Sequence, residues 1–429
     1  MLPIKTLIYL FFFVSCCGLS VFYTPVIGVY GYLAAYNINP LSQWWGNYLP
    51  AWAERYSFIL AACIAIGTII NFNKLKFKSL LDRQEVLLIL FWLVVVFSNF
   101  LGQGYSETQE YIIFKVSKFS LIILVASHVV TRLKHYDGLL WVLIISGFWL
   151  SSELFFGAGS FRGARFHGGV GGSDFGEGNF LAAHFGMLVP MLGIMILKGN
   201  WKTRLLCCAG AVFLLNAIVL IRSRGAFLAL FLGAVVTFFY SFKIESYRKL
   251  ILVMLCIAAA GGISLTNVYF WERMTTIGTQ DDGKRDVSAQ HRLMAWDGAW
   301  QMAKDFPLGV GAGNFFDHIG RYYPVLEGRD THNTYFRCLA ELGFHGLFVL
   351  ILLILNAYWM LSRIHKTAAV FEKKLRSRIQ LYVYAMKTAM VIYLTAAIFI
   401  SSTYIEELYW LLLFPVFLKR SVENEMETA

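Results

Sequence analysis

The sequence has few charged residues and few prolines for its length. Of 429 residues, 15% are charged and 58% are hydrophobic, whereas soluble domains contain about 25% charged and roughly 45–50% apolar residues. This excludes a globular enzyme that is surrounded by water. Eight prolines and 36 glycines without a regular period also exclude collagen-like and disordered chains. The composition therefore predicts an all-α polytopic membrane protein.

The seven cysteines provide no paired spacing in a loop. Six lie in apolar runs and Cys338 lies just inside another, so we expect neither structural disulfides nor a zinc site, and cysteine content does not identify the compartment. Only Lys5 precedes the first apolar run, and no convincing small-residue cleavage site follows it. We expect this run to be a retained membrane anchor and not a cleaved signal peptide.

A helix needs about 20 mostly apolar residues to cross the hydrocarbon core of a bilayer. On this basis we predict about 12 transmembrane helices. Residues 25–38 are also apolar but are interrupted by Pro25, Gly28 and Gly31, so we expect them to lie in or dip into the interface. The twelve predicted spans are 5–23, 57–71, 85–101, 112–130, 138–156, 179–197, 205–221, 225–241, 250–266, 334–361, 380–401 and 405–418.

The net charge of +11 is concentrated in alternate loops. Basic residues cluster around Lys76, Arg132, Lys202, Arg248 and Lys373. The positive-inside rule places such loops in the cytoplasm, and twelve crossings then place both termini there. The basic excess is therefore a topology signal, and nucleic-acid binding is not supported.

Two unusual loops fall on the opposite face. Residues 157–178 are rich in glycine, and residues 267–333 form one long hydrophilic loop, a length that is usually functional or folded. Residues 293–303 have helical periodicity and predict an amphipathic helix within that loop. We divide the chain into N-terminal helices (1–204), a core (205–361) and a C-terminal part (362–429).

The positive-inside rule does not predict arginines on this outer face, so these arginines are candidate ligands for anions. Arg222 and Arg224 lie in a tight turn between two spans, where a buried charge without a partner is costly. A guanidinium offers a two-pronged contact to phosphate oxygens, although both side chains could instead reach lipid phosphates. Arg162, Arg165 and His167 could contact a glycan or phosphate, or simply be solvated.

Further along the chain, a glycine-rich run and a histidine lie near the start of a span. Gly309, Gly311 and Gly313 lack the preceding strand of a nucleotide-binding loop, and predict a bend close to substrate or to a helix end. His332 is suited to accept a proton near neutral pH. Asp281-Asp282 fits a solvated loop tip better than a metal site.

Two lysines, Lys115 and Lys118, follow two glutamates near the outer end of a predicted span. We expect them to be ion-paired or to extend toward the membrane surface.

The motifs Ser223-Arg224-Gly-Ala, Pro307–Phe315 and His332-Asn-Thr-Tyr with Glu341–Gly346 resemble the signature of the O-antigen ligase/polymerase superfamily, over about residues 205–355. That superfamily includes lipopolysaccharide O-antigen ligases, O-antigen polymerases and bacterial O-oligosaccharyltransferases. Pro25, Asn39-Pro40 and Gly178-Asn179 are similar to O-glycosylation ligases associated with exosortase systems.

The resemblance implies an inverting glycosyl transfer that needs no metal or cofactor, at the periplasmic face of a bacterial inner membrane. The donor would be a glycan on a polyprenyl diphosphate, and the acceptor a hydroxyl of a lipid or protein. His332 would activate this hydroxyl, and Arg224 and Arg292 would bind the diphosphate. Arg222 is a plausible second contact.

Arg321, Arg329 and Arg337 are candidates only through their proximity in the sequence. A polymerase that uses a second lipid-linked glycan as acceptor remains open. So does a transporter or flippase, which should show ionisable residues near the membrane midplane; the sequence shows few.

Overall fold

The computed structural model describes residues 2–75, 81–104, 106–162, 165–266, 268, 271 and 287–428. Asp281 and Asp282 lie outside the described residues, as does the side chain of Arg162. All seven cysteines are free thiols, as the sequence predicts.

The longer elements are α1 (Ile4–Phe22), α2 (Pro25–Ile38), α3 (Ala51–Glu54), α4 (Tyr56–Ile70), α5 (Arg83–Leu101), α6 (Glu107–Val129), α7 (Leu133–Phe155), β1 (Ser160–Arg162), β2 (Arg165–Gly168), α8 (Gly178–Lys198), α9 (Trp201–Ile221), α10 (Arg224–Ser241), α11 (Arg248–Leu265), α13 (Val287–Asp305), α14 (Phe315–His318), α15 (Thr334–Thr367), α16 (Lys373–Ala396) and α17 (Glu406–Thr428). The short 3-10 turns are η1 (Pro40–Ser42), η2 (Trp44–Tyr48), η3 (Phe72–Lys74), η4 (Ser173–Phe175), η5 (Ile319–Arg321), η6 (Pro324–Leu326) and η7 (Ala368–Val370).

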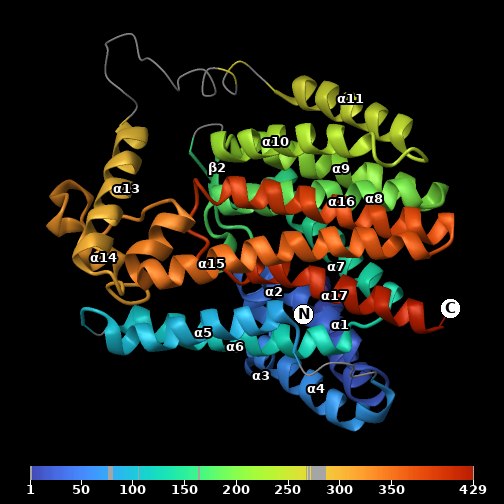
Figure 1. The fold of residues 1–429 in the computed structure, drawn as a ribbon, viewed down its shortest axis with the longest axis horizontal. Coiled ribbons are helices and arrows are strands. Elements are labelled where there is room, and N and C mark those ends of the chain that lie inside the picture. The colour runs from blue at the N-terminus through green and yellow to red at the C-terminus, as the bar shows by residue number, and fades with distance from the viewer. Residues whose placement is uncertain are drawn as a thin grey trace.

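The protein is an all-α bundle whose long helices mostly follow its longest dimension (Figure 1). Helices α8 to α11 are stacked along one side, α15 and α16 cross the middle, and α5 and α6 lie on the other side. Within the described residues, nine helices are long and apolar enough to cross a membrane. This confirms the predicted polytopic membrane fold.

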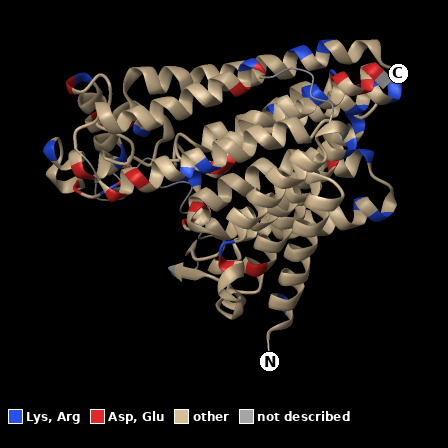
Figure 2. Cartoon of the chain, turned by 90° about the horizontal axis from the view of Figure 1, so that it is seen from below, with Lys and Arg blue, Asp and Glu red and all other residues tan. Residues whose placement is uncertain are grey.

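The two ends of the bundle differ in charge. Lys and Arg predominate at the end that holds the C-terminus, whereas at the opposite end they mix with Asp and Glu (Figure 2). We call the first the basic end. The second, where α13, α14 and the β1–β2 hairpin lie, we call the loop end.

Helix α2 corrects the prediction for residues 25–38. The segment is a buried helix packed against α1, α4 and α7, with Val29 and Tyr32 almost fully enclosed. The glycines that suggested an interrupted segment permit close packing instead: a Cβ on Gly28 would lie 2.2 Å from Ser20 Oγ, and one on Gly31 would lie 2.7 Å from Cys16 Cβ. Residues 25–38 therefore form one continuous helix, and the expectation of an interrupted segment is wrong.

Helix α2 runs from the basic end of the bundle toward the glycine-rich loop. Pro25 lines a small cavity with Arg132 at the basic end, whereas the Tyr36 hydroxyl donates to Asp174 Oδ2 at 2.9 Å, next to the glycine-rich loop. The helix thus adds a traverse of the bundle. Accordingly, Lys5 Nζ lies 2.8 Å from Glu153 Oε1, at the loop end of α7.

Helix α15 breaks at Gly343, and the glycine-rich run closes the break. Gly343 has φ 67° and ψ −172°, so helical hydrogen bonding stops there. Val310 N donates to Ala340 O at 3.0 Å and Gly311 N donates to Glu341 O at 2.9 Å. Carbonyl groups that the break would leave without partners are thereby satisfied. This confirms the predicted close approach of the run to a helix end.

The predicted helix in the long loop is also confirmed. Helix α13 spans the predicted residues 293–303 and extends beyond them at both ends. Its residues Ala299 and Met302 are buried in a small core with Phe315 and Ile319. The described part of the long loop is therefore a packed subdomain and not an extended connection.

Candidate active site

A polar cavity of about 350 Å³ lies at the loop end, where six separate segments of the chain meet. It brings together three of the predicted site residues: His332, Arg224 and Arg292. The residues that line it are Arg165, His167, Glu177, Gly178, Asn179, Ser223, Arg224, Gly225, Arg292, His332 and Phe399.

His332 is held in a left-handed backbone conformation, with φ 47°, which is uncommon for a residue other than glycine. Both of its neighbours are fixed. The Asn333 side-chain oxygen accepts hydrogen bonds from Tyr335 N at 2.9 Å and Phe336 N at 3.1 Å, which caps α15. Thr331 is fully buried. The His332 side chain lines the cavity, and its ring makes no hydrogen bond to any other described residue.

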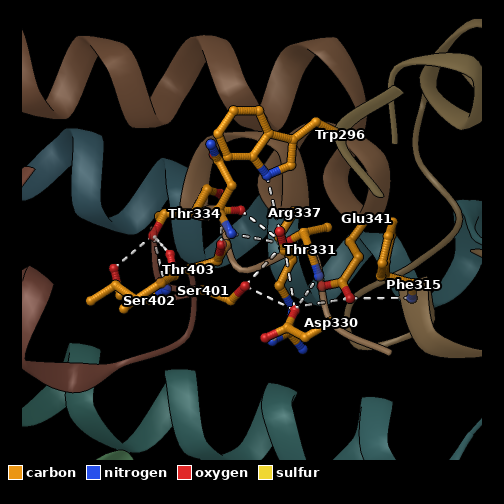
Figure 3. A network of polar contacts seen from close by, with 12 residues as sticks. Trp296, Phe315, Asp330, Thr331, Thr334, Arg337, Glu341, Ser401, Ser402 and Thr403 are labelled. Atoms are coloured by element: carbon orange, nitrogen blue, oxygen red, sulfur yellow. Dashed lines mark hydrogen bonds and ion pairs between the residues drawn. The ribbon is translucent and has the colours of Figure 1, made fainter. Parts of the chain in front are cut away.

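The Thr331 hydroxyl is the centre of the network that fixes this backbone (Figure 3). It donates to Asn333 O at 3.0 Å and lies 2.9 Å from Ser401 Oγ, and it accepts from Asn333 N at 3.2 Å. Ser401 Oγ in turn donates to Asp330 Oδ1 at 2.8 Å. The turn between α16 and α17, which contains Ser401, therefore holds the His332 loop in place.

Arg337 and Glu341 extend the same network into α15 (Figure 3). Arg337 Nε lies 3.3 Å from Glu341 Oε1, and its Nη1 lies 3.7 Å from Asp330 Oδ1. Glu341 Oε1 also accepts from Phe315 N at 3.2 Å. Arg337 does not line the cavity; its contacts are those of a residue that positions the His332 loop.

Arg224 reaches the cavity because the α9–α10 turn is very short. Arg222 ends α9 in the left-handed conformation, with φ 52°, and Ser223 Oγ accepts from Ala226 N at 3.4 Å to cap α10. Arg224 is then the first residue of α10 and lines the cavity. Arg222 is buried and does not line it, so the turn separates the two guanidinium groups.

Arg292 projects from α13 and is tied to the His332 loop through the next helical turn. Trp296 Nε1 donates to Thr331 O at 3.0 Å, and the Trp296 ring stacks on Phe336, with centroids 5.7 Å apart. One rigid unit thus carries both Arg292 and His332.

Arg321 and Arg329 are close to this unit in sequence but do not line the cavity. Both are exposed, and Arg329 Nη1 lies 3.0 Å from His291 Nδ1. Next to Arg321, the Tyr322 hydroxyl donates to Asp305 Oδ2 at 2.7 Å. Burial and this hydrogen bond raise the pKa of Tyr322 to about 12, so the phenol stays protonated at neutral pH.

The glycine-rich loop supplies the facing wall. Arg165 and His167 come from β2, and Glu177 and Asn179 flank the start of α8. Arg165 Nε donates to Ile221 O at 3.2 Å, which fixes the strand to the end of α9. These residues were open candidates or were not singled out from the sequence, because nothing in a glycine-rich segment shows which side chains face inward.

The electrostatics of the cavity favour a polyanion. Three guanidinium groups line it, and Glu177 is the one carboxylate among its lining residues in the described part of the chain. Helices α8 and α10 begin at its wall and α15 begins two residues after His332. Helix N-termini carry partial positive charge and bind phosphate groups.

Residues 209–351 match the family model described as O-antigen ligase. The chain contains an O-antigen ligase domain. This confirms the resemblance seen in the motifs, and the matched residues include Arg224, Arg292 and His332 but not the glycine-rich loop. The family indicates a membrane enzyme of the ligase or polymerase type that uses a lipid-linked glycan. Comparison with curated proteins gave no match.

An apolar groove of about 540 Å³ adjoins the cavity of this O-antigen ligase domain. Ser223 lines both spaces. From there the groove follows α10 to Tyr240 and Ser241, enclosed by side chains of α8, α9, α11 and α16. The 18 residues of α10 correspond to about 27 Å of groove, comparable with the hydrocarbon core of a bilayer.

A buried polar cluster lies behind the glycine-rich loop, and sequence reasoning missed most of it. Lys115 pairs with Asp174, which confirms the expected ion pair for this lysine. His184 Nδ1 pairs with Glu407, and Trp410 Nε1 donates to Glu406 Oε1 at 2.9 Å. The adjacent acids of α17 in an otherwise apolar run were the available signal.

Proposed function

We propose that this protein transfers a glycan from a polyprenyl diphosphate carrier to a hydroxyl acceptor on a lipid or protein. The observation that carries the proposal is the single cavity in which His332 lies among Arg165, Arg224 and Arg292. Diphosphate is a polyanion, and guanidinium groups bind its oxygens with two-pronged hydrogen bonds.

In the proposed reaction, the acceptor oxygen attacks the anomeric carbon while the bond from that carbon to the diphosphate oxygen breaks. An imidazole nitrogen of His332 takes the proton of the acceptor hydroxyl. Arg224 and Arg292 stabilise the charge that develops on the departing diphosphate, which preorganised cations do strongly at a water-poor boundary. Attack from the side opposite the leaving group inverts the configuration of the anomeric carbon.

The apolar groove along α10 supports a lipid-linked donor. A polyprenyl chain lying in this groove would place its diphosphate at Ser223, where the groove meets the arginines of the cavity. On the opposite wall, His167, Glu177 and Asn179 would bind sugar hydroxyl groups, and Arg165 would add a third contact to the diphosphate.

The charge distribution supports a periplasmic location for this reaction, in a bacterial inner membrane. The basic end of the bundle is opposite to the cavity (Figure 2), and basic loops remain in the cytoplasm. The acceptor decides between a ligase and a polymerase, which extends another lipid-linked glycan.

The test is transfer by the purified protein, with a lipid-linked oligosaccharide as donor and alternative acceptors. His332→Ala should bind the donor as wild type does and lose transfer by about 100-fold or more, as expected for a general base. His291→Ala is the matched control, because His291 lies on α13 but does not line the cavity. Wild-type transfer by the His332 variant would refute the proposal.

The same assay separates the alternatives. Products that grow by repeated additions to lipid-linked glycan indicate a polymerase, and a single addition to a different acceptor indicates a ligase. A transporter would form no glycosidic bond with any acceptor.

A further inference from the structure

A second polar cavity, of about 400 Å³, lies at the basic end of the bundle. It is formed where the start of α5, the last turns of α15 and the middle of α17 meet. Helix α15 begins two residues after His332 and ends at this cavity, so the cavity belongs to a different site. Its lining residues include Arg83, Trp359, Arg363 and Lys419.

The carboxylates around this cavity are already neutralised. Lys419 Nζ lies 2.5 Å from Asp82 Oδ2 and 3.7 Å from Glu423 Oε1. Arg420 reaches past the cavity to the buried Glu85, at 2.7 Å. These pairs account for the acidic residues that line the cavity and for the buried carboxylate beside it.

Two guanidinium groups remain without a carboxylate. Within the described residues, neither Arg83 nor Arg363 makes an ion pair or a hydrogen bond through its side chain. The Arg363 guanidinium instead lies 4.6 Å from the centre of the Trp359 ring, which orients it but leaves its N–H groups available. Arg83 is also the first residue of α5, where the helix dipole adds partial positive charge.

An apolar stripe leads along the surface of α15 to Arg363. Ile351, Leu355 and Trp359 are 40%, 59% and 51% exposed, and they follow one another at intervals of four residues that continue to Arg363. Exposed apolar side chains on a membrane helix face acyl chains, and tryptophan is enriched at the level of the headgroups. The stripe and the cavity therefore have the amphipathic layout of a phospholipid.

We propose that this cavity binds the phosphate of an anionic phospholipid headgroup between Arg83 and Arg363, with an acyl chain along the α15 stripe. Guanidinium groups suit this role because they bind two phosphate oxygens at once and remain charged at any physiological pH. From the sequence, these arginines indicate only the orientation of the chain in the membrane. Because both arginines line one cavity, we infer that they bind the same phosphate.

The test is native mass spectrometry of the detergent-purified full chain, titrated with phosphatidylglycerol or with phosphatidylethanolamine of the same acyl chains. The variant is Arg83→Gln with Arg363→Gln. We expect its affinity for phosphatidylglycerol to fall about 10- to 30-fold, because each basic residue contributes about 1 kcal/mol to binding of anionic lipid. Binding of phosphatidylethanolamine should stay weak in both proteins.

Arg248→Gln is the matched control. Arg248 is an exposed arginine whose guanidinium lies 4.8 Å from the centre of the Phe242 ring, but it does not line the cavity. Its substitution should leave lipid binding unchanged. Because Arg83 and Arg363 are exposed, the double variant should keep the wild-type Tm; the two single variants, each weaker by several-fold, provide the same test independently.

Equal retention of phosphatidylglycerol by the wild type and the double variant would overturn the proposal. So would an equal loss in Arg248→Gln, which would show a general charge effect. Displacement of the lipid by inorganic phosphate at the same concentration would assign the cavity to a soluble phosphate and also overturn it. Persistence of the lipid against inorganic phosphate supports it.

Discussion

Replacement of Thr331 by valine tests whether the network beneath His332 contributes to catalysis. Thr331→Val preserves shape but removes the hydroxyl that joins Asn333 O, Asn333 N and Ser401 Oγ. Each such bond contributes about 1 kcal/mol net, so up to about 3 kcal/mol of local order is lost. Asn333 N is also left buried without its acceptor.

Part of that lost free energy should appear as a lower rate of turnover. Since about 1.4 kcal/mol corresponds to tenfold in rate, we expect kcat to fall about 10- to 100-fold, with the KM for the donor nearly unchanged because the arginines keep their places. Thr331→Ser retains the hydroxyl and should keep most of the activity. The assay is steady-state transfer, normalised to the fraction of protein that binds donor, together with Tm.

One result would refute this reasoning. If Thr331→Val lowers Tm but keeps wild-type kcat per binding-competent molecule, the network only stabilises the fold and does not position His332. A parallel loss in Thr331→Ser would refute it as well, because that variant keeps the hydrogen bonds.

The remaining predictions concern an arginine of the cavity and the break in α15. Arg224→Lys should lower kcat/KM for the donor by about tenfold or more, because an ammonium cannot make the two-pronged contact; wild-type turnover would remove Arg224 from the site. Gly343→Ala should destabilise the protein by about 2 kcal/mol or more, because its φ of 67° is strained for alanine and its Cβ would lie 2.3 Å from Pro307 O. Gly18→Ala, where a Cβ meets nothing within 4 Å, is the control, and an equal Tm in both variants would contradict the reasoning.

The membrane helices were largely predictable because each must satisfy its own backbone hydrogen bonds and present apolar side chains, a signal contained within about 20 residues. Helix α2 was not predicted because its glycines indicate a break when the sequence of this segment is considered alone. Only the position of Ser20 and Cys16 on α1 shows that these glycines are contact surfaces.

The residues of the candidate site could be predicted where they belong to a recognisable motif. They could not be predicted where the tertiary structure decides which side chains face the cavity. Arg224, Arg292 and His332 meet in one cavity. Arg321 and Arg329 were inferred from proximity to His332, but the chain between α14 and α15 turns them outward to solvent. Arg165 faces the cavity because a hairpin and a hydrogen bond to Ile221 direct it, and no local pattern encodes that.

The break in α15 has a consequence for the proposed transfer of large glycans. Val310 N and Gly311 N donate to the carbonyl groups just before this break, and Trp296 of α13 donates to Thr331 O. This wall of the cavity is therefore hydrogen-bonded to α15 and to the His332 loop. The opposite wall is the glycine-rich loop, where Gly159, Gly169 and Gly171 adopt positive φ. We expect the size of glycan that the proposed reaction accepts to depend on that loop, so exchanging the loop between homologous enzymes should change the size of glycan that they transfer.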